Sequence, residues 1–319
     1  MQISQVVGPR SSRIIDIADP VASHNQVVVD VIAVGVCTSD WGAWNTHRSA
    51  DRPLRLGHEI VGRVRSVGAP DLGWQEGQLV TGLASGGFAT RALINSVDIL
   101  PVPLGVPAEL ALGEPLACLV EALGRCPLSR VDRVAVVGLG FMGLGLVQLI
   151  RSRGAQLIVG VDPSPDARAH GLHNGADEVY APDDLPLEYR DTVSSTHEAR
   201  MDLVFEVTGV THGLATAGSL VRPYGTMCVV GYHHTGDAKV DPALWYKAVT
   251  IVNGFSPDRR RTMAAMREGL ALVADHRFDY RPLITHSFGL DEVDMAFALM
   301  ESREPSFVKS VLDPMRGRS

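Results

Sequence analysis

Three side chains of types that bind zinc occur close together early in the sequence. Cys37 opens the run Cys-Thr-Ser-Asp, and His58 and Glu59 lie in the run Gly-His-Glu. A thiolate, an imidazole and a carboxylate suit zinc, and a catalytic zinc site uses three protein groups and keeps a fourth position open. Taken singly, Cys37 is explained as a small buried apolar residue and His58 as a hydrogen-bonded structural histidine. Together, upstream of a nucleotide-binding pattern, they predict a metal centre.

A glycine-rich turn in the middle of the chain has the pattern that binds a dinucleotide pyrophosphate. The apolar run 134–137 leads into G-x-G-x-x-G and then into an apolar helical pattern. Glycines allow a tight turn and bring backbone N–H groups close to phosphates, whose charge the helix N-terminus stabilises. The residues expected to hold the cofactor at this turn are Gly138, Gly140, Phe141, Met142 and Gly143.

The residue after the next apolar run bears on the choice of cofactor. Asp162 lies 19 residues past Gly143, near the spacing of an acid that binds the adenosine ribose. Its carboxylate would repel a 2′-phosphate, and Arg168 is six residues further on, so NAD is favoured over NADP. Thr208 and Gly231 follow two later strands, where they could meet the nicotinamide half. Ordinary strand-to-loop turns explain those two positions equally well.

The elements that must position these residues change in type along the chain. In the first hundred residues, apolar runs such as 26–32 and 60–64 are broken by Gly and Pro, which indicates a small barrel. From about residue 130, short buried strands alternate with helical patterns, as is typical of parallel βαβ units. The pattern from about residue 259 predicts helix, strand, helix and strand, and a return to the first domain. We therefore expect a discontinuous catalytic domain, 1–118 and 258–319, and a nucleotide-binding domain, 119–257.

Composition excludes several classes of partner. The 319 residues carry a net charge of −7 without a basic stripe, which argues against nucleic acid. The N-terminus has no secretory pattern and no segment is long and apolar enough to span a membrane, so we expect a cytoplasmic protein. The four cysteines are scattered and form no C-x-x-C pair, which predicts free thiols or metal ligands.

The combination and order of these motifs resemble those of the zinc-containing medium-chain dehydrogenases. The matching runs are Cys-Thr-Ser-Asp, Gly-His-Glu followed by Ile-Val-Gly-Arg-Val, Gly86-Gly87-Phe88-Ala89, and Gly113-Glu114-Pro115-Leu116 ahead of the glycine turn. The resemblance covers nearly the whole chain. The sorbitol and polyol dehydrogenase branch is the most similar, because it has Glu-Pro-Leu where alcohol dehydrogenases have a cysteine ligand. It implies an α/β protein with a GroES-like β-barrel catalytic domain and a Rossmann doubly wound parallel sheet.

The resemblance also implies roles for individual residues. Cys37, His58 and Glu59 are then the expected zinc ligands, with Glu114 as an exchangeable or water-bridged fourth. Ser39 matches the hydroxyl that contacts the substrate oxygen and begins a proton relay; its ordinary explanation is a turn serine. The expected reaction is hydride transfer between NAD and a secondary alcohol, with zinc as the Lewis acid. The alcohol is expected to be a polyol, sugar or cyclitol.

Two departures from the family pattern affect the expectations. The run from Thr81 to Gly87 passes directly across the place where many relatives insert a four-cysteine lobe, so we expect one catalytic zinc per chain and no structural zinc. Gly42 stands where many relatives have a histidine that ends the proton relay. His47 is one substitute, and solvent or a cofactor ribose hydroxyl is the other.

Several alternatives stay open at this point. A zinc-free quinone or enone reductase shares the two domains but predicts no metal and a preference for NADPH, and a non-catalytic nucleotide-binding relative predicts no turnover. Trp41 and Trp44 either line the substrate pocket or pack in the core. The run 250–255 is a plausible edge strand for pairing, so we expect a homodimer or homotetramer.

Overall fold

The apolar runs of the first hundred residues form strands of one seven-stranded sheet in the computed structural model. The structure describes residues 1–319 except 49–51, 127, 131, 190–199, 234–238 and 317–319. The sheet order is β14-β15-β3-β4-β5-β7, and β6 pairs with β3 outside that order. Its strands are β3 (Gln26–Gly35), β4 (Glu59–Val67), β5 (Leu79–Leu83), β6 (Arg91–Asn95), β7 (Ile99–Pro101), β14 (Ile284–Gly289) and β15 (Lys309–Asp313).

The strand β3 is central to this sheet because three other strands pair with it. It runs antiparallel to β4 along most of its length, to β6 in its first half and to β15 at its end. Its burial pattern is almost continuous, as expected of a strand covered on both faces. The last residues of β3 therefore lie beside the first residues of β4 and beside Val311 and Leu312 of β15, which is distant in the sequence.

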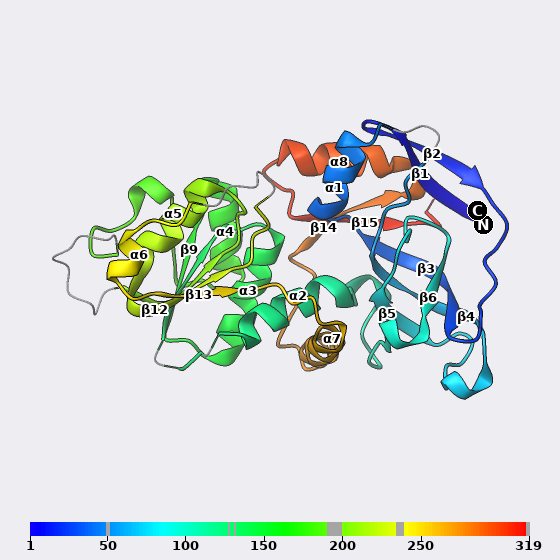
Figure 1. The fold of residues 1–319 in the computed structure, drawn as a ribbon, viewed down its shortest axis with the longest axis horizontal. Coiled ribbons are helices and arrows are strands. Elements are labelled where there is room, and N and C mark those ends of the chain that lie inside the picture. The colour runs from blue at the N-terminus through cyan, green and yellow to red at the C-terminus, as the bar shows by residue number, and fades with distance from the viewer. Residues whose placement is uncertain (49–51, 127, 131, 190–199, 234–238, 317–319) are drawn as a thin grey trace. The chain divides into compact units, whose positions relative to one another are not determined.

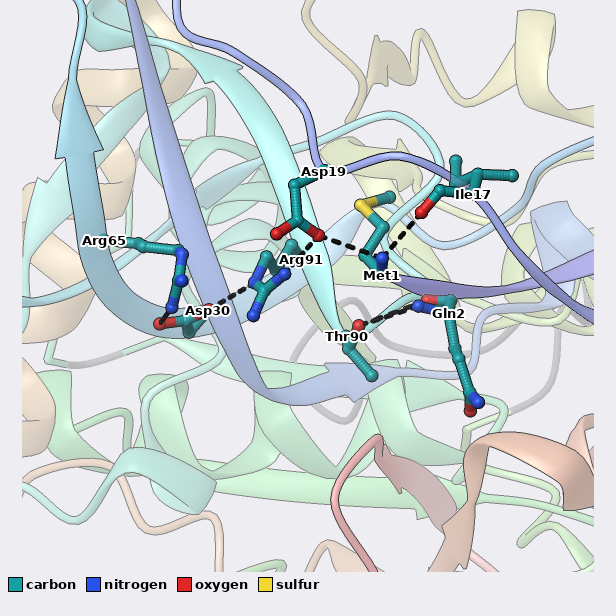
Figure 2. Close-up of polar contacts among 8 residues, drawn as sticks. All are labelled: Met1, Gln2, Ile17, Asp19, Asp30, Arg65, Thr90 and Arg91. Carbon is teal, nitrogen blue, oxygen red and sulfur yellow. Dashed lines mark hydrogen bonds and ion pairs between the residues drawn. The ribbon is translucent and has the colours of Figure 1, made fainter.

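A hairpin of β1 (Gln2–Gly8) and β2 (Ser11–Asp16) precedes this sheet. Charged groups link the segment after the hairpin to the sheet (Figure 2). The amino group of Met1 lies 2.9 Å from Asp19, and Arg91 contacts both Asp19 and Asp30, which also contacts Arg65. The hydrogen bond from the Met1 amino group and the charge of Arg91 lower the pKa of Asp19. The carboxylates of Asp19 and Asp30 are nearly half exposed, so we assign these contacts a structural role of small energetic weight.

The middle of the chain forms a six-stranded sheet in the order β10-β9-β8-β11-β12-β13, and every pair is parallel. Numbered from its first strand, this is the order 3-2-1-4-5-6 of a doubly wound dinucleotide-binding sheet. Figure 1 shows helices packed against its strands. The strands are β8 (Arg133–Val137), β9 (Leu157–Val161), β10 (Glu178–Tyr180), β11 (Met201–Glu206), β12 (Val221–Val229) and β13 (Thr250–Asn253).

Helices connect strands of both sheets. They are α1 (Thr38–Thr46), α2 (Gly113–Gly124), α3 (Phe141–Arg153), α4 (Pro165–His173), α5 (Thr211–Leu220), α6 (Ala243–Tyr246), α7 (Arg259–Ala274) and α8 (Val293–Ser302). Short 3-10 turns lie at Pro70–Leu72, Ser96–Asp98, Ala108–Leu110, Pro182–Asp184 and Leu290–Glu292. None of the helices among the described residues has the length and apolarity to cross a membrane.

The chain divides into two compact units. The first comprises Met1–Ala117 and Met266–Ser319, and the second comprises Cys118–Ala265. The passage between them falls inside α2 and inside α7, whereas the sequence suggested boundaries after residues 118 and 257. The second boundary differs because the sequence pattern marks where a helix begins and carries no sign of which unit packs against its later turns.

Candidate functional site

The register of β3 and β4 brings the predicted metal ligands together. Gly35 pairs with Glu59, so Cys37, two residues past the end of β3, lies beside the start of β4. Ligand atoms of Cys37, His58 and Glu59 all lie within 4.8 Å of one another, and this is the one such group among the described residues. The antiparallel pairing therefore assembles a thiol, an imidazole and a carboxylate from segments 22 residues apart.

Glu59 is almost completely buried, and a glycine and a lysine define its surroundings. A Cβ on Gly35 would lie 1.8 Å from Oε2 of Glu59, so only glycine leaves room for this carboxylate. The Nζ of Lys309 donates to Oε1 at 3.1 Å and lies 2.8 Å from Oε2, without hydrogen-bond geometry to the latter. Oε2 thus has no hydrogen-bond donor among the described residues, which leaves a lone pair of this buried oxygen for a cation.

Lys309 is the first residue of β15 and is buried next to the ligand group. Its Nζ also donates to the carbonyl oxygen of Val36 at 3.2 Å. Burial alone lowers the pKa of a lysine, but the negative charges of Glu59, Cys37 and Glu114 and the hydrogen bond to Glu59 outweigh it, so the pKa of Lys309 is raised. The lysine is therefore a fixed positive charge behind the carboxylate.

His58 is oriented by Asp40, which lies in the first turn of α1. The Nδ1 atom of His58 is 3.1 Å from Oδ2 of Asp40. Burial lowers the pKa of His58, but the contacts with Asp40 and Cys37 and the charges of Asp40 and Glu59 raise it to about 11. A carboxylate on Nδ1 fixes the ring so that Nε2 is the nitrogen left for a metal, the arrangement common around zinc-binding histidines.

The charge of this group fits a divalent cation. Cys37, Asp40 and Glu59 are acidic, and Lys309 is the only permanently cationic side chain that contacts them among the described residues. The same surplus of negative charge raises the pKa of His58, because it stabilises a proton on the imidazole. A thiolate, an imidazole and a carboxylate oxygen without a donor form a donor set that suits zinc.

The residues expected in the proton relay lie on α1 and directly after it. The hydroxyl of Ser39 donates to Sγ of Cys37 at 3.2 Å and is exposed, so it sits directly at the ligand group. A Cβ on Gly42 would meet no atom within 4 Å, which leaves open space where relatives carry a histidine side chain. His47 caps the C-terminus of α1 through its backbone N–H to Ala43.

Glu114, expected as a fourth ligand, is not a member of the three-residue group. It lies in the first turn of α2, and its charge contributes to the raised pKa of Lys309, which places it near that buried ammonium group. Direct zinc binding by Glu114 stays a prediction.

The two tryptophans of α1 have different surroundings. Trp44 is 2% exposed, stacks on Phe297 with ring centroids 5.0 Å apart, and donates from Nε1 to Asp294 at 2.6 Å. Trp44 is therefore a core residue and does not line a substrate pocket. Trp41 is half-buried against the same core, and its Nε1 has no hydrogen-bond partner among the described residues.

The glycine turn between β8 and α3 has the geometry expected of a phosphate cradle. Gly138 has φ +99°, which favours glycine, and a Cβ on Gly143 would lie 1.8 Å from the carbonyl oxygen of Gly138. Gly140 caps α3, is exposed, and a Cβ on it would meet no atom within 4 Å. Phe141 and Met142 form the first turn of α3. A glycine turn that leads into a helix N-terminus in this way is the arrangement that binds phosphate anions.

Asp162, which we expect to bind the adenosine ribose, lies next to this cradle. Its Oδ2 accepts from the backbone N–H of Leu139 at 2.9 Å and its Oδ1 from that of Ser164 at 2.8 Å. The guanidinium of Arg168 donates to the carbonyl oxygens of Asp162 and Pro163, each at 2.8 Å. Arg168, six residues further along the sequence, therefore lies beside Asp162 at the end of β9.

Thr208 and Gly231 lie at the ends of β11 and β12. Thr208 donates from its N–H and its hydroxyl to Oε1 of Glu206, and a Cβ on Gly231 would lie 2.2 Å from the backbone nitrogen of Gly209. The two loops therefore touch, and glycine at position 231 permits the contact.

Sequence reasoning gave no role to Asp40 or Lys309. Asp40 stands in the Cys-Thr-Ser-Asp run, three residues past the candidate thiolate, which is the spacing of one helical turn. Lys309 is one of only three lysines in the chain and interrupts an apolar strand, Phe-Val-Lys-Ser-Val-Leu. A charged residue inside a buried strand signals a buried partner.

Comparison with known proteins accords with this geometry. The family description "Alcohol dehydrogenase GroES-like domain" matches residues 23–104, and "Zinc-binding dehydrogenase" matches residues 142–272. The sorbitol dehydrogenase of Halalkalibacterium halodurans is 25% identical and covers 93% of this chain and 94% of its own length. The NADP-dependent isopropanol dehydrogenase of Clostridium beijerinckii is 25% identical over 92% of this chain and 94% of its own length.

The fold is shared with solved structures at low sequence identity. A crystal structure of 2R,3R-butanediol dehydrogenase from Bacillus subtilis superposes with a TM-score of 0.84 and 22% identity over 98% of this chain and 99% of that one. The first match lies in the first compact unit, and the second lies in the second unit except for its last residues, 266–272, in the order that the motifs predicted. The chain therefore belongs to the zinc-binding, medium-chain alcohol dehydrogenase family, with a GroES-like domain and a Rossmann sheet.

Proposed function

We propose that the protein is an NAD-linked dehydrogenase that interconverts a secondary alcohol of a polyol, sugar or cyclitol and the corresponding ketone, with one zinc ion held by Cys37, His58 and Glu59. The observation that carries this proposal is the cluster of three ligand atoms within 4.8 Å, backed by a buried carboxylate oxygen without a donor. Relatives named for sorbitol and L-galactonate support a polyhydroxylated substrate.

The residues around the three candidate zinc ligands have roles that fit this reaction. Bound zinc supplies Lewis acidity toward the substrate hydroxyl, and the nicotinamide ring supplies the hydride acceptor. Asp40 holds the ring of His58, and Lys309 donates a hydrogen bond that fixes the carboxylate of Glu59. The Ser39 hydroxyl, which donates to Cys37 and is exposed, can accept the substrate proton and release its own.

The proton must leave by a route different from that of relatives that have a histidine at the position of Gly42. Gly42 leaves space there, so we propose that water carries the proton from Ser39 outward, with His47 as the alternative acceptor. Water-mediated transfer needs only a short chain of hydrogen bonds and no further side chain.

NAD is proposed as the cofactor because the Asp162 carboxylate lies next to the glycine turn, where we expect the adenosine ribose. A 2′-phosphate would meet its negative charge. Arg168 offers a positive charge at the same strand end, but its guanidinium is hydrogen-bonded to two backbone carbonyl groups. Relatives include an NADP-dependent enzyme, so cofactor choice is part of the test.

The test is an initial-rate survey of the purified, zinc-containing protein. NAD and NADP are each combined with simple secondary alcohols, acyclic polyols, aldonates and cyclitols, and the reverse reaction is measured with the matching ketones. The proposal predicts the largest kcat/KM with NAD and a polyhydroxylated alcohol. Turnover of quinones or enones with NADPH by zinc-free protein would replace it with the reductase function.

We further propose a homo-oligomer that pairs β13 with its copy. β13 is the last strand of its sheet and pairs only with β12 among the described strands. Apolar side chains are exposed on and beside it, namely Trp245, Tyr246, Ile251 and Phe255. Such an edge is a ready template for a second strand. Sedimentation of wild type and Ile251→Lys tests this proposal, which fails if both are monomers or both are the same oligomer.

A further inference from the structure

Glu206, at the end of β11, is a fully buried carboxylate that ties two loops together. Its Oε1 accepts from the N–H of Thr208 at 2.7 Å and from that of Gly209 at 3.0 Å. Its backbone carbonyl accepts from the N–H groups of Val230 and Gly231 at 2.8 and 3.0 Å. The loop after β11 and the loop after β12 are therefore both fixed on one residue.

His233 contacts Glu206 through one ring nitrogen, and its other ring nitrogen has no hydrogen-bond partner among the described residues. Its Nε2 lies 3.1 Å from Oε2 of Glu206, and the imidazole is nine-tenths buried. Because a carboxylate only accepts hydrogen bonds, Nε2 carries the proton of this contact. Nδ1 is buried and has no hydrogen-bond partner among the described residues. In the neutral ring this atom is an acceptor, and a buried acceptor without a donor is costly.

The position of this acceptor indicates what fills it. β11 and β12 are the fourth and fifth strands of the doubly wound sheet, on the opposite side of the first strand from the half that carries the adenosine. Their carboxyl ends belong to the nicotinamide half of a bound dinucleotide. The nicotinamide ring carries a carboxamide whose NH₂ group is a hydrogen-bond donor.

We propose that His233 is a cofactor-binding residue, held by Glu206 through Nε2 so that Nδ1 accepts a hydrogen bond from the carboxamide NH₂ of the nicotinamide. This inference rests on the proposed use of a nicotinamide cofactor, and it adds a side-chain contact that selects the carboxamide and fixes the rotation of the ring. Glu206 is the positioning residue, because it acts only through the imidazole.

The test compares binding of two reduced cofactors to the full-length protein. One is NADH, and the other is its 3-acetylpyridine analogue, in which a methyl group replaces the NH₂ and the carbonyl is kept. Dissociation constants are measured by cofactor fluorescence and by calorimetry, without substrate. One hydrogen bond predicts that the wild type prefers NADH by roughly three- to tenfold.

Two substitutions separate the two nitrogens of the imidazole. His233→Asn can place an amide oxygen near the position of Nδ1, whereas His233→Gln can place an amide N–H near Nε2 and keep the link to Glu206. We expect the asparagine variant to keep a preference for NADH and the glutamine variant to bind the two cofactors equally. His173→Phe, at the exposed end of α4, is the matched control and should keep the wild-type preference.

The outcomes are distinct from those of the proposed function. A wild type that binds both cofactors equally, or a glutamine variant with an unchanged preference, overturns the role of His233 and does not contradict the proposed dehydrogenase function. If the variants do not fold, histidine ¹⁵N resonances of the wild type decide instead. The Nδ1 signal of one imidazole should move toward the hydrogen-bonded range with NADH and not with the analogue, and equal shifts with both overturn the proposal.

Discussion

Replacing Lys309 by methionine removes the charge behind the metal site while keeping most of the side-chain volume. The Nζ atom lies 2.8 and 3.1 Å from the two carboxylate oxygens of Glu59, and the side chains are 5% and 2% exposed. Removing one member of a buried ion pair leaves the other charge uncompensated and costs about 3–5 kcal/mol. We therefore expect Lys309→Met to lower the free energy of unfolding of the zinc-free protein by about 3–5 kcal/mol.

Urea unfolding in the presence of a chelator measures this loss. Trp41, Trp44 and Trp74, three of the four tryptophans, lie in the unit that contains the site, so fluorescence reports chiefly on that unit. The control is Lys239→Met, which removes an exposed lysine and should change stability by less than about 0.5 kcal/mol. Saturating zinc should shrink the loss, because the ion supplies a second positive charge next to Glu59.

A double variant decides whether the ion pair is the cause. Glu59→Gln with Lys309→Met removes both charges, and we expect it to be more stable than Lys309→Met alone, since no unpaired charge remains buried. A loss below about 1 kcal/mol for Lys309→Met, or a double variant whose loss equals the sum of the single losses, would refute the reasoning.

Three further predictions follow from other contacts. Ser39→Ala should keep its zinc and lower kcat by about 100-fold or more through loss of proton transfer, seen in steady-state rates beside zinc analysis. Asp162→Ser should raise the ratio of kcat/KM for NADP over NAD by about tenfold or more, and an unchanged ratio would count against the cofactor assignment. Trp44→Phe should cost about 2–3 kcal/mol in urea unfolding because it removes the bond to Asp294 and leaves a cavity, whereas Trp41→Phe, whose Nε1 has no described partner, should cost less.

The sequence was sufficient for the fold class and the order of the domains. Apolar runs and glycine turns are local signals, so strands such as β3, β4, β8 and β9 and the turn after β8 could be predicted from neighbouring residues. The proximity of Cys37 to His58 follows from pairing two consecutive strands, which is also a local event in the chain.

The rest of the site depends on contacts that no local pattern encodes. Lys309 is 250 residues from Glu59 and meets it only because β15 pairs with the end of β3. The sequence could not decide whether Trp44 lies in the core or in the substrate pocket, and its packing against Phe297 places it in the core. His233 follows a strand in the same way as many loop residues do, and only its contact with Glu206 distinguishes it.

The metal content of the protein, measured together with its activity, tests the central claim most directly. Inductively coupled plasma mass spectrometry of the wild type should give one zinc per chain, and of Cys37→Ser much less than one, with dehydrogenase activity lost in proportion. Cys118→Ser, which lies outside the ligand group, is the control and should retain both zinc and activity. Zinc-free wild-type protein that turns over at the full rate, or a Cys37→Ser variant with one zinc and undiminished activity, would contradict the account.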